Sequence, residues 1–123
     1  MRPSLALSIG AAINILIGLP LVLAPAQLLS SLGFATSAEV QARDAGVAVI
    51  GLGIINWLAR DAVGTPLRGL LWGNIFIRVA AMGVNYWELA AGLMPSAAAS
   101  LFPILTAINI ALIVVFALAL RRA

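Results

Sequence analysis

The chain has 123 residues and a net charge of +3, and 63% of its residues are hydrophobic while only 9% are charged. Soluble domains carry about 25% charged residues, so this composition and the mean hydropathy of +1.14 exclude a soluble globular protein and predict an integral membrane protein. With no cysteine and no histidine, the chain lacks the ligands of iron-sulfur clusters, His-ligated haem and the commonest zinc sites, so we expect no cofactor of these kinds.

The length allows four membrane spans of about 20 residues with short connections. Apolar stretches predict these spans at about residues 4–23, 38–59, 69–93 and 97–120. We therefore expect residues 1–123 to form a single all-α domain, an antiparallel bundle of four transmembrane helices. The positive charge does not predict nucleic-acid binding, because the arginines form no basic patch with interleaved aromatic residues.

The first span, residues 4–23, begins after Arg2 and ends before Ala24-Pro25-Ala26. This pattern is shared with cleaved signal peptides, but the apolar run is longer than a typical signal core, so we expect a retained span. Residues 25–37 mix leucine and phenylalanine with serine, threonine and glutamine. That mixture predicts a short helix at the membrane surface between the first two spans.

The second span carries Glu39, Arg43 and Asp44 in its first two turns. Glu39 and Arg43 are four residues apart and are expected to pair along the helix. The acidic residues Glu39 and Asp44 are typical of a solvated helix start, where the helix dipole favours negative charge. They are equally compatible with the rim of a buried polar site.

The third span has three distinct faces if it is a helix turning about 100° per residue. Its polar residues fall within an arc of roughly 80°, which makes them a stripe along one side: Asn74, Arg78, Asn85 and Glu88. Glycines lie on a second face, where we expect close packing against a neighbour: Gly69, Gly73 and Gly83. We predict that this helix lies at the centre of the bundle.

Arg78 is predicted to lie near the bilayer centre, roughly 14 Å above the end of its helix. An uncompensated arginine there costs about 3 to more than 10 kcal/mol, so Arg78 must be paired, hydrated or bound to an anion. One interpretation is that Asn14 and Asn109 bind Arg78 and join the helices. A second interpretation is that Arg78 lines a ligand pocket or a water-filled path. A third is that an acidic group of a partner protein pairs with it.

Charged partners within the chain are a further prediction. An extended Arg78 side chain is expected to approach Asp44, and Arg43 is expected to approach Glu88, which would form a charged cluster in one half of the bundle. Five arginines lie at predicted span ends on a single side: Arg2, Arg60, Arg68, Arg121 and Arg122. The positive-inside rule then places both termini in the cytoplasm.

The motif Ala42-Arg43-Asp44-Ala45-Gly46, followed by Gly51-Leu52-Gly53, resembles the DoxX-like family and neighbouring small bacterial membrane families of unknown function. The resemblance also rests on the four-span layout. It implies a location in the bacterial inner membrane and a quinone-linked or accessory role in a membrane oxidoreductase system. It transfers no catalytic residue to this chain.

Three functions are compatible with these features. The first is binding or transport of an anionic or amphipathic small molecule, such as a lipid or quinone headgroup. The candidate ligand-binding residues are Arg78, Asn74, Asn85, Asn14, Asn109, Arg43 and Glu39. The second is an accessory subunit of a larger membrane complex, or a homo-oligomer. The third is a small membrane isomerase, cyclase or hydrolase that uses Asp44 or Glu88 as acid or base. Membrane lipid is the expected partner in each case, and no metal site is expected.

Overall fold

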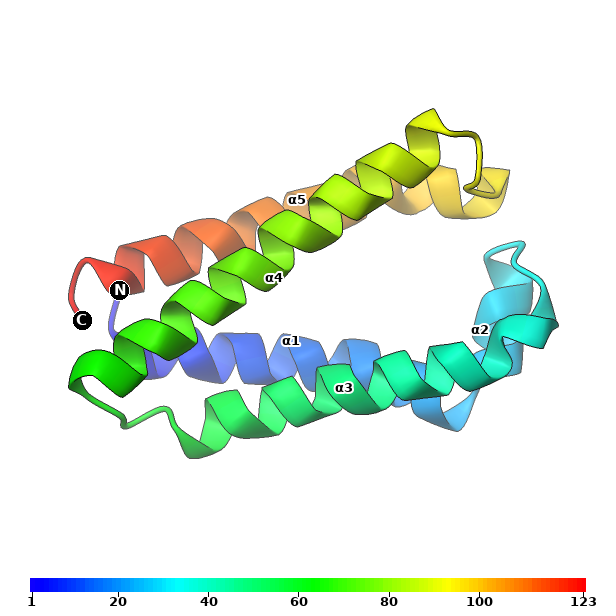
Figure 1. Ribbon diagram of the computed structural model, residues 1–123. Helices are drawn as coiled ribbons and strands as arrows, with labels where there is room; N and C mark the ends of the chain where they lie inside the picture. Colours follow the sequence, from blue (N-terminus) through cyan, green and yellow to red (C-terminus); the bar gives the residue numbers. More distant parts are fainter.

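The computed structural model describes residues 1–123 and contains only helical secondary structure, which confirms the predicted all-α class. Four long helices run side by side, and a short helix closes one end (Figure 1). In chain order the elements are α1 (Pro3–Leu23), α2 (Pro25–Ser31), a 3-10 turn (Thr36–Ala38), α3 (Glu39–Leu58), α4 (Gly64–Ala90) and α5 (Ser96–Leu120).

The start of α4 differs most from the sequence prediction. The predicted third span begins at residue 69, yet the helix already begins at Gly64. Pro66 lies in the first turn, where a missing N–H removes no intrahelical hydrogen bond, so it does not prevent the helix from starting there. Gly64 itself has a positive φ of 67°, a conformation that glycine adopts readily.

Three helices, α1, α4 and α5, are long and apolar enough to cross a membrane. The 20-residue α3 is also long enough, but it falls outside this set because Glu39, Arg43 and Asp44 make its first turns polar. Three candidate spans in 123 residues indicate a small multi-pass membrane protein. The second predicted span, residues 38–59, is therefore not among the helices that qualify by composition.

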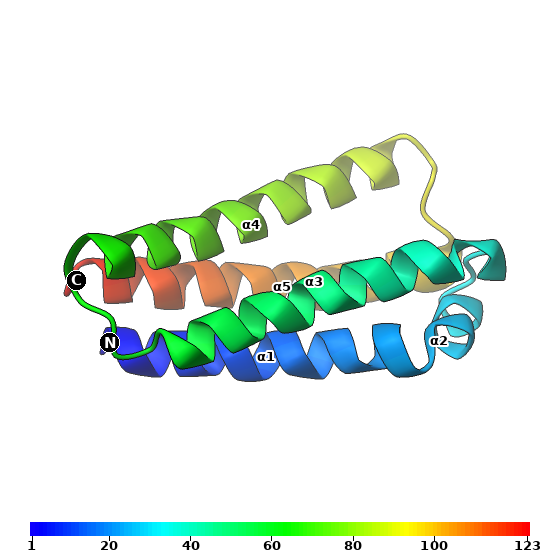
Figure 2. The same cartoon turned by 60° about the horizontal axis from the view of Figure 1, so that its bottom comes forward.

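The long helices form two pairs, α1 with α3 and α4 with α5, and α1 also contacts α5. Figure 2 shows α4 diverging from α1 and α3 toward its C-terminal end. By backbone packing, α1 and not the predicted third span is the central helix, because α1 packs against both α3 and α5, whereas α4 packs closely only against α5. Both chain termini lie at the same end of the bundle (Figure 1).

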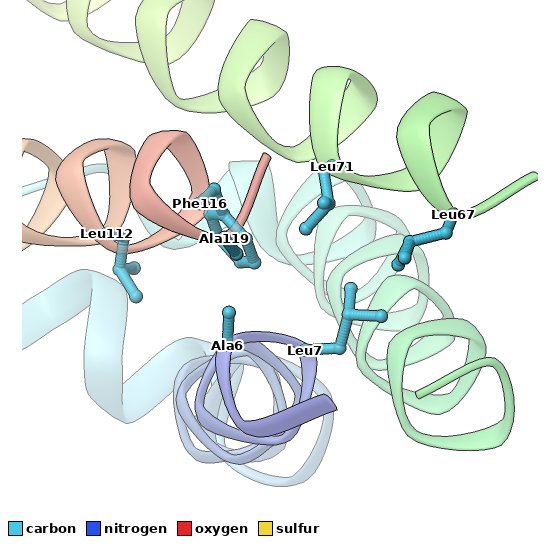
Figure 3. Packing of buried hydrophobic residues seen from close by; sticks show 7 residues of the cluster. All are labelled: Ala6, Leu7, Leu67, Leu71, Leu112, Phe116 and Ala119. Carbon is cyan, nitrogen blue, oxygen red and sulfur yellow. The ribbon is translucent and has the colours of Figure 1, made fainter. Parts of the chain in front are cut away.

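The hydrophobic core lies at the end of the bundle that holds the termini. Apolar side chains from α1, α4 and α5 meet there (Figure 3). The cluster comprises Ala6, Leu7, Leu67, Leu71, Leu112, Phe116 and Ala119. Because this core fixes only one end, the opposite ends of α4 and α1 are free to lie further apart.

Glycines bring α1 and α3 into close contact. A Cβ atom added to Gly46 would lie 3.0 Å from the Gly18 carbonyl oxygen, and one added to Gly53 would lie 3.1 Å from the Ala11 carbonyl oxygen. These distances are shorter than most real contacts of a Cβ atom, so a larger residue would require the two backbones to move apart, and the glycines permit their close approach. α1 and α3 therefore form the most closely packed pair.

The predicted packing face of the third span is not packed. A Cβ atom added to Gly69, Gly73 or Gly83 of α4 would have no atom within 4 Å, and all three glycines are exposed. The prediction failed because a glycine pattern permits a close neighbour but does not supply one. The close contacts instead involve Gly18, Gly46 and Gly53 on the other helix pair.

Candidate functional site

The first polar contact between helices is a reciprocal pair of amides on α3 and α4. The Asn56 Nδ2 donates to Asn74 Oδ1, and the Asn74 Nδ2 donates to Asn56 Oδ1, each over 2.9 Å. The Asn74 Nδ2 also donates to the Leu70 carbonyl oxygen over 2.8 Å. Both side chains are buried. Asn74, a predicted ligand-binding residue, is thus occupied in joining α4 to α3.

The second polar contact surrounds Arg78, one turn further along α4. Its Nη2 donates to Asn14 Oδ1 on α1, and its Nη1 lies 3.5 Å from Asn109 Oδ1 on α5. Arg78 is 9% exposed and Asn14 is 1% exposed. These are the two amide partners considered for Arg78 in the sequence, and the contacts join three helices at one point.

Two donor atoms in this cluster have no acceptor. Arg78 Nε and Asn14 Nδ2 are both buried without a hydrogen-bond partner. An unmet buried donor costs about 1–3 kcal/mol, and more when the group is charged. The Arg78 guanidinium also forms no ion pair with a carboxylate, because the only ion pairs in the chain are Arg43–Glu39 and Arg60–Asp61. The Arg78 cluster therefore has unused capacity to bind an acceptor or an anion.

The predicted charged cluster of Arg78, Asp44, Arg43 and Glu88 does not form. Asp44 is exposed on α3 and makes no ion pair with Arg78. Arg43 instead pairs with Glu39 over 2.9 Å, as the four-residue spacing predicted. Its Nε also lies 3.5 Å from the Val22 carbonyl oxygen on α1. Both predicted cross-bundle pairs are wrong. Arg43 is held at the start of α3, beside the end of α1, and Arg78 contacts Asn14 and Asn109 instead of Asp44.

A partly open cavity of about 440 Å³ lies at the end of the bundle opposite the core. It is bounded by α1, α2, α4, α5 and the connections between them. Its wall is largely apolar, and Asn85 and Glu88 are its polar side chains. The lining residues are Ile17, Pro20, Leu21, Leu28, Leu32, Phe34, Asn85, Glu88, Met94, Ala98, Leu101, Phe102 and Leu105.

The Arg78 cluster lies directly beyond the inner end of this cavity along three helices. Asn14 precedes the cavity residue Ile17 by about one turn of α1, and Asn109 follows Leu105 by about one turn of α5. Arg78 lies two turns before Asn85 on the same face of α4. The helix rise places Arg78 about 10 Å from Asn85 along the axis and about 15 Å from Glu88.

The predicted site residues thus separate into four groups. Arg78, Asn14 and Asn109 meet in one cluster, Asn85 and Glu88 line the cavity, and Asn74 pairs with Asn56. The remaining predicted residues, Glu39, Arg43 and Asp44, lie at the start of α3 outside the cavity.

Sequence reasoning missed two features of the site. Asn56 is not among the predicted site residues, although it holds Asn74 in place. The sequence also did not predict that Pro20 and Phe102 line a cavity. Phe102 is held in place by an edge-to-face contact with Tyr86, with 4.7 Å between the ring centroids. Pro20, a proline inside an apolar helix, was the one signal that could have drawn attention to this wall.

The fold and the polar residues together define a class: a small helical protein with three candidate membrane spans and a buried network of arginine and asparagine. Comparisons with protein-family models, with curated proteins and with solved structures found no match. The resemblance to the DoxX-like family therefore stays a prediction from the sequence motif.

Proposed function

We propose that this protein binds an amphipathic small molecule from the membrane, with the apolar part of the ligand in the 440 Å³ cavity. The volume falls within the range of about 300–1,000 Å³ that is typical of small-molecule sites. The observation that carries this proposal is the position of the cavity. Along α4 it lies about two helical turns from Arg78, a buried arginine that forms no ion pair. Arg78 Nε and Asn14 Nδ2 are both donors without an acceptor.

An anionic or acceptor-bearing end of the ligand faces Arg78 in this proposal. The Nε of Arg78 and the Nδ2 of Asn14 both donate, so a carboxylate, phosphate or quinone oxygen fits them, and an ammonium group does not. Asn85 contacts the middle of the ligand. Glu88 lies at the other end of the cavity, where its carboxylate accepts a hydrogen bond from a hydroxyl group or from water.

The proposal includes α3 as a fourth membrane-embedded helix. Its glycines pack against α1, and its outer side carries exposed apolar side chains such as Val40, Val47 and Ile54. These side chains suit contact with lipid. In this proposal both termini lie on one side of the membrane, and the arginine distribution favours the cytoplasm of a bacterial cell as that side.

The accessory-subunit and enzyme hypotheses have less support. Of the two proposed acid-base residues only Glu88 lines the cavity, while Asp44 is exposed on α3 and does not line it. A role as an accessory subunit or in a quinone-linked complex remains compatible with ligand binding. Transport would require a path that continues past Arg78 to the other end of the bundle, and binding is the simpler proposal.

Binding of radiolabelled decanoate to the protein in lipid nanodiscs tests this function, with decanol as the neutral probe and empty nanodiscs subtracted. Hydrogen bonds to charged groups contribute about 1.5–3 kcal/mol. Arg78→Ala should therefore weaken decanoate binding by at least about tenfold. Arg78→Lys should restore part of the loss, and decanol should be affected much less.

Two further variants distinguish a loss of binding at this site from a general effect of substitution on the protein. Ala98→Phe fills the cavity without touching Arg78, so it should weaken both probes. Arg43→Gln removes an exposed arginine outside the cavity and should leave both unchanged. Unaltered decanoate binding in folded Arg78→Ala and Ala98→Phe proteins would refute the proposal.

A further inference from the structure

A second, polar groove lies at the end of the bundle that holds the termini. It has a volume of about 390 Å³ and lies between the start of α1 and the link from α3 to α4. Its lining residues are Arg2, Ser4, Leu5, Ser8, Arg60 and Asp61. It is far from the apolar cavity and shares no residue with it.

The groove carries two arginines and one acid, so its net charge is positive. The Arg2 side chain has no partner within the chain. Arg60 stacks on the Trp57 ring, 4.2 Å from its centroid, and its Nη1 donates to the Trp57 carbonyl oxygen over 2.6 Å. Asp61 is 4.0 Å from Arg60 Nε and its side chain is 80% exposed, so water screens most of this pair.

Hydrogen-bond donors outnumber acceptors among the groove side chains. The Ser8 hydroxyl already donates to the Ser4 carbonyl oxygen over 2.8 Å, whereas the Ser4 hydroxyl is free to donate. Arg60 keeps its Nη2 for a ligand, and Arg2 keeps its whole guanidinium. Guanidinium groups bind phosphate with two parallel hydrogen bonds, so two of them across one groove favour a phosphate anion.

We propose that this groove binds a phosphate-bearing anion, either the headgroup of an acidic phospholipid or a soluble phosphate ester. The surroundings favour the lipid. Leu5 at the edge of the groove is 52% exposed and Trp57 is 49% exposed, and tryptophan and arginine near helix ends are typical of the headgroup level of a membrane. Acyl chains can then lie along α1 while the phosphate contacts Arg2 and Arg60.

Native mass spectrometry from a neutral detergent can measure this binding, with dioctanoyl phosphatidylglycerol as the probe and dioctanoyl phosphatidylcholine as the zwitterionic control. Each arginine near an anionic headgroup contributes about a fivefold gain in affinity. The double variant Arg2→Gln/Arg60→Gln should therefore bind the anionic lipid about thirtyfold more weakly. Asp61→Asn should bind it more tightly, because the variant removes the only acid of the groove.

The matched control is Arg121→Gln/Arg122→Gln, which removes the same charge from the same end of the molecule but outside the groove. This variant should stay within about twofold of the unmodified protein, since it retains both groove arginines. Equal losses in the two double variants would overturn the proposal, because they would indicate attraction to overall charge. Equal affinity for both lipids would also overturn it.

Two measurements complete the test. Arg60→Lys keeps the charge but not the paired hydrogen bonds, so it should retain part of the binding. This partial retention distinguishes loss of the charge from misfolding. Glycerol 3-phosphate is added as a competitor to distinguish the two sources of phosphate. Displacement of the lipid supports the groove as a site for soluble esters, and no displacement supports it as a lipid site.

Discussion

At the scale of single residues, Asn56 and Asn74 pair with each other, so the side-chain nitrogen and oxygen of each have a hydrogen-bond partner. Replacing Asn74 with leucine leaves the buried Asn56 amide without its partner, so we expect the free energy of unfolding to fall by about 1–3 kcal/mol. The double variant Asn56→Leu/Asn74→Leu removes both amides, and should be more stable than the sum of the two single changes predicts. Unfolding titrations in sodium dodecyl sulfate can measure both effects.

Asn85→Leu is the control for that prediction. Asn85 lies on the same face of α4 but lines the cavity and makes no hydrogen bond to another helix, so its replacement should change stability by less than about 0.5 kcal/mol. If Asn74→Leu is equally mild, the amide pair does not contribute to stability as described.

The polar stripe of α4 was predictable from the sequence, but its partners were not. Helical spacing places Asn74, Arg78, Asn85 and Glu88 on one side of the helix. The partner of each residue depends on how the neighbouring helices are rotated and tilted, which one-dimensional spacing does not specify. Arg78 consequently meets amides on α1 and α5, whereas Asp44 was a plausible partner by depth alone.

At the scale of helices, the α1–α3 contact depends on glycine more than on large side chains. A Cβ atom on Gly46 would lie 2.8 Å from Leu21 Cβ and 3.0 Å from the Gly18 carbonyl oxygen. We therefore expect Gly46→Ala to destabilise the protein by about 1–3 kcal/mol, which is typical of overpacking. The same unfolding titration measures it.

Gly73→Ala makes the same chemical change on an open face of α4. It should be neutral, or stabilising by up to about 1 kcal/mol, because alanine favours helix more than glycine does. A clear loss of stability in Gly73→Ala would mean that this face is packed against another molecule in the membrane.

Helix number and most helix bounds followed from apolar runs and from proline and glycine breaks. The predicted span at 97–120 corresponds to α5 (Ser96–Leu120), and the surface helix predicted within 25–37 corresponds to α2 and the following 3-10 turn. The start of α4 was missed because a proline that breaks a helix interior is accepted in a first turn.

At the scale of the whole molecule, the question is whether α3 crosses the membrane with the other three long helices. The chain has no cysteine, so single cysteines can be labelled without background. If α3 crosses, Asp61→Cys and Arg122→Cys should react with an impermeant maleimide from one side. Ser31→Cys and Ala91→Cys should react only from the other side.

The alternative topology gives a different labelling pattern. With only α1, α4 and α5 crossing, positions 31 and 61 would react from the same side, and position 122 would react from the side opposite the N-terminus. That pattern would contradict both the four-span proposal and the cytoplasmic placement of the two termini.

The cavity is a property of the whole bundle and was not predictable from any segment. It forms because the core holds α4 to α1 and α5 at one end only, while the other end of α4 diverges (Figure 2). The sequence indicated a buried arginine that needs a partner. It did not indicate that an apolar space lies beside that arginine.

The central claim is that a ligand occupies this space and reaches toward Arg78. An experimental structure of the protein purified from its native membrane in a mild detergent tests it most directly. The proposal predicts elongated non-protein density from the wall near Glu88 toward the Arg78–Asn14 contact. A dry interior, filled by side chains that close the cavity, would contradict it.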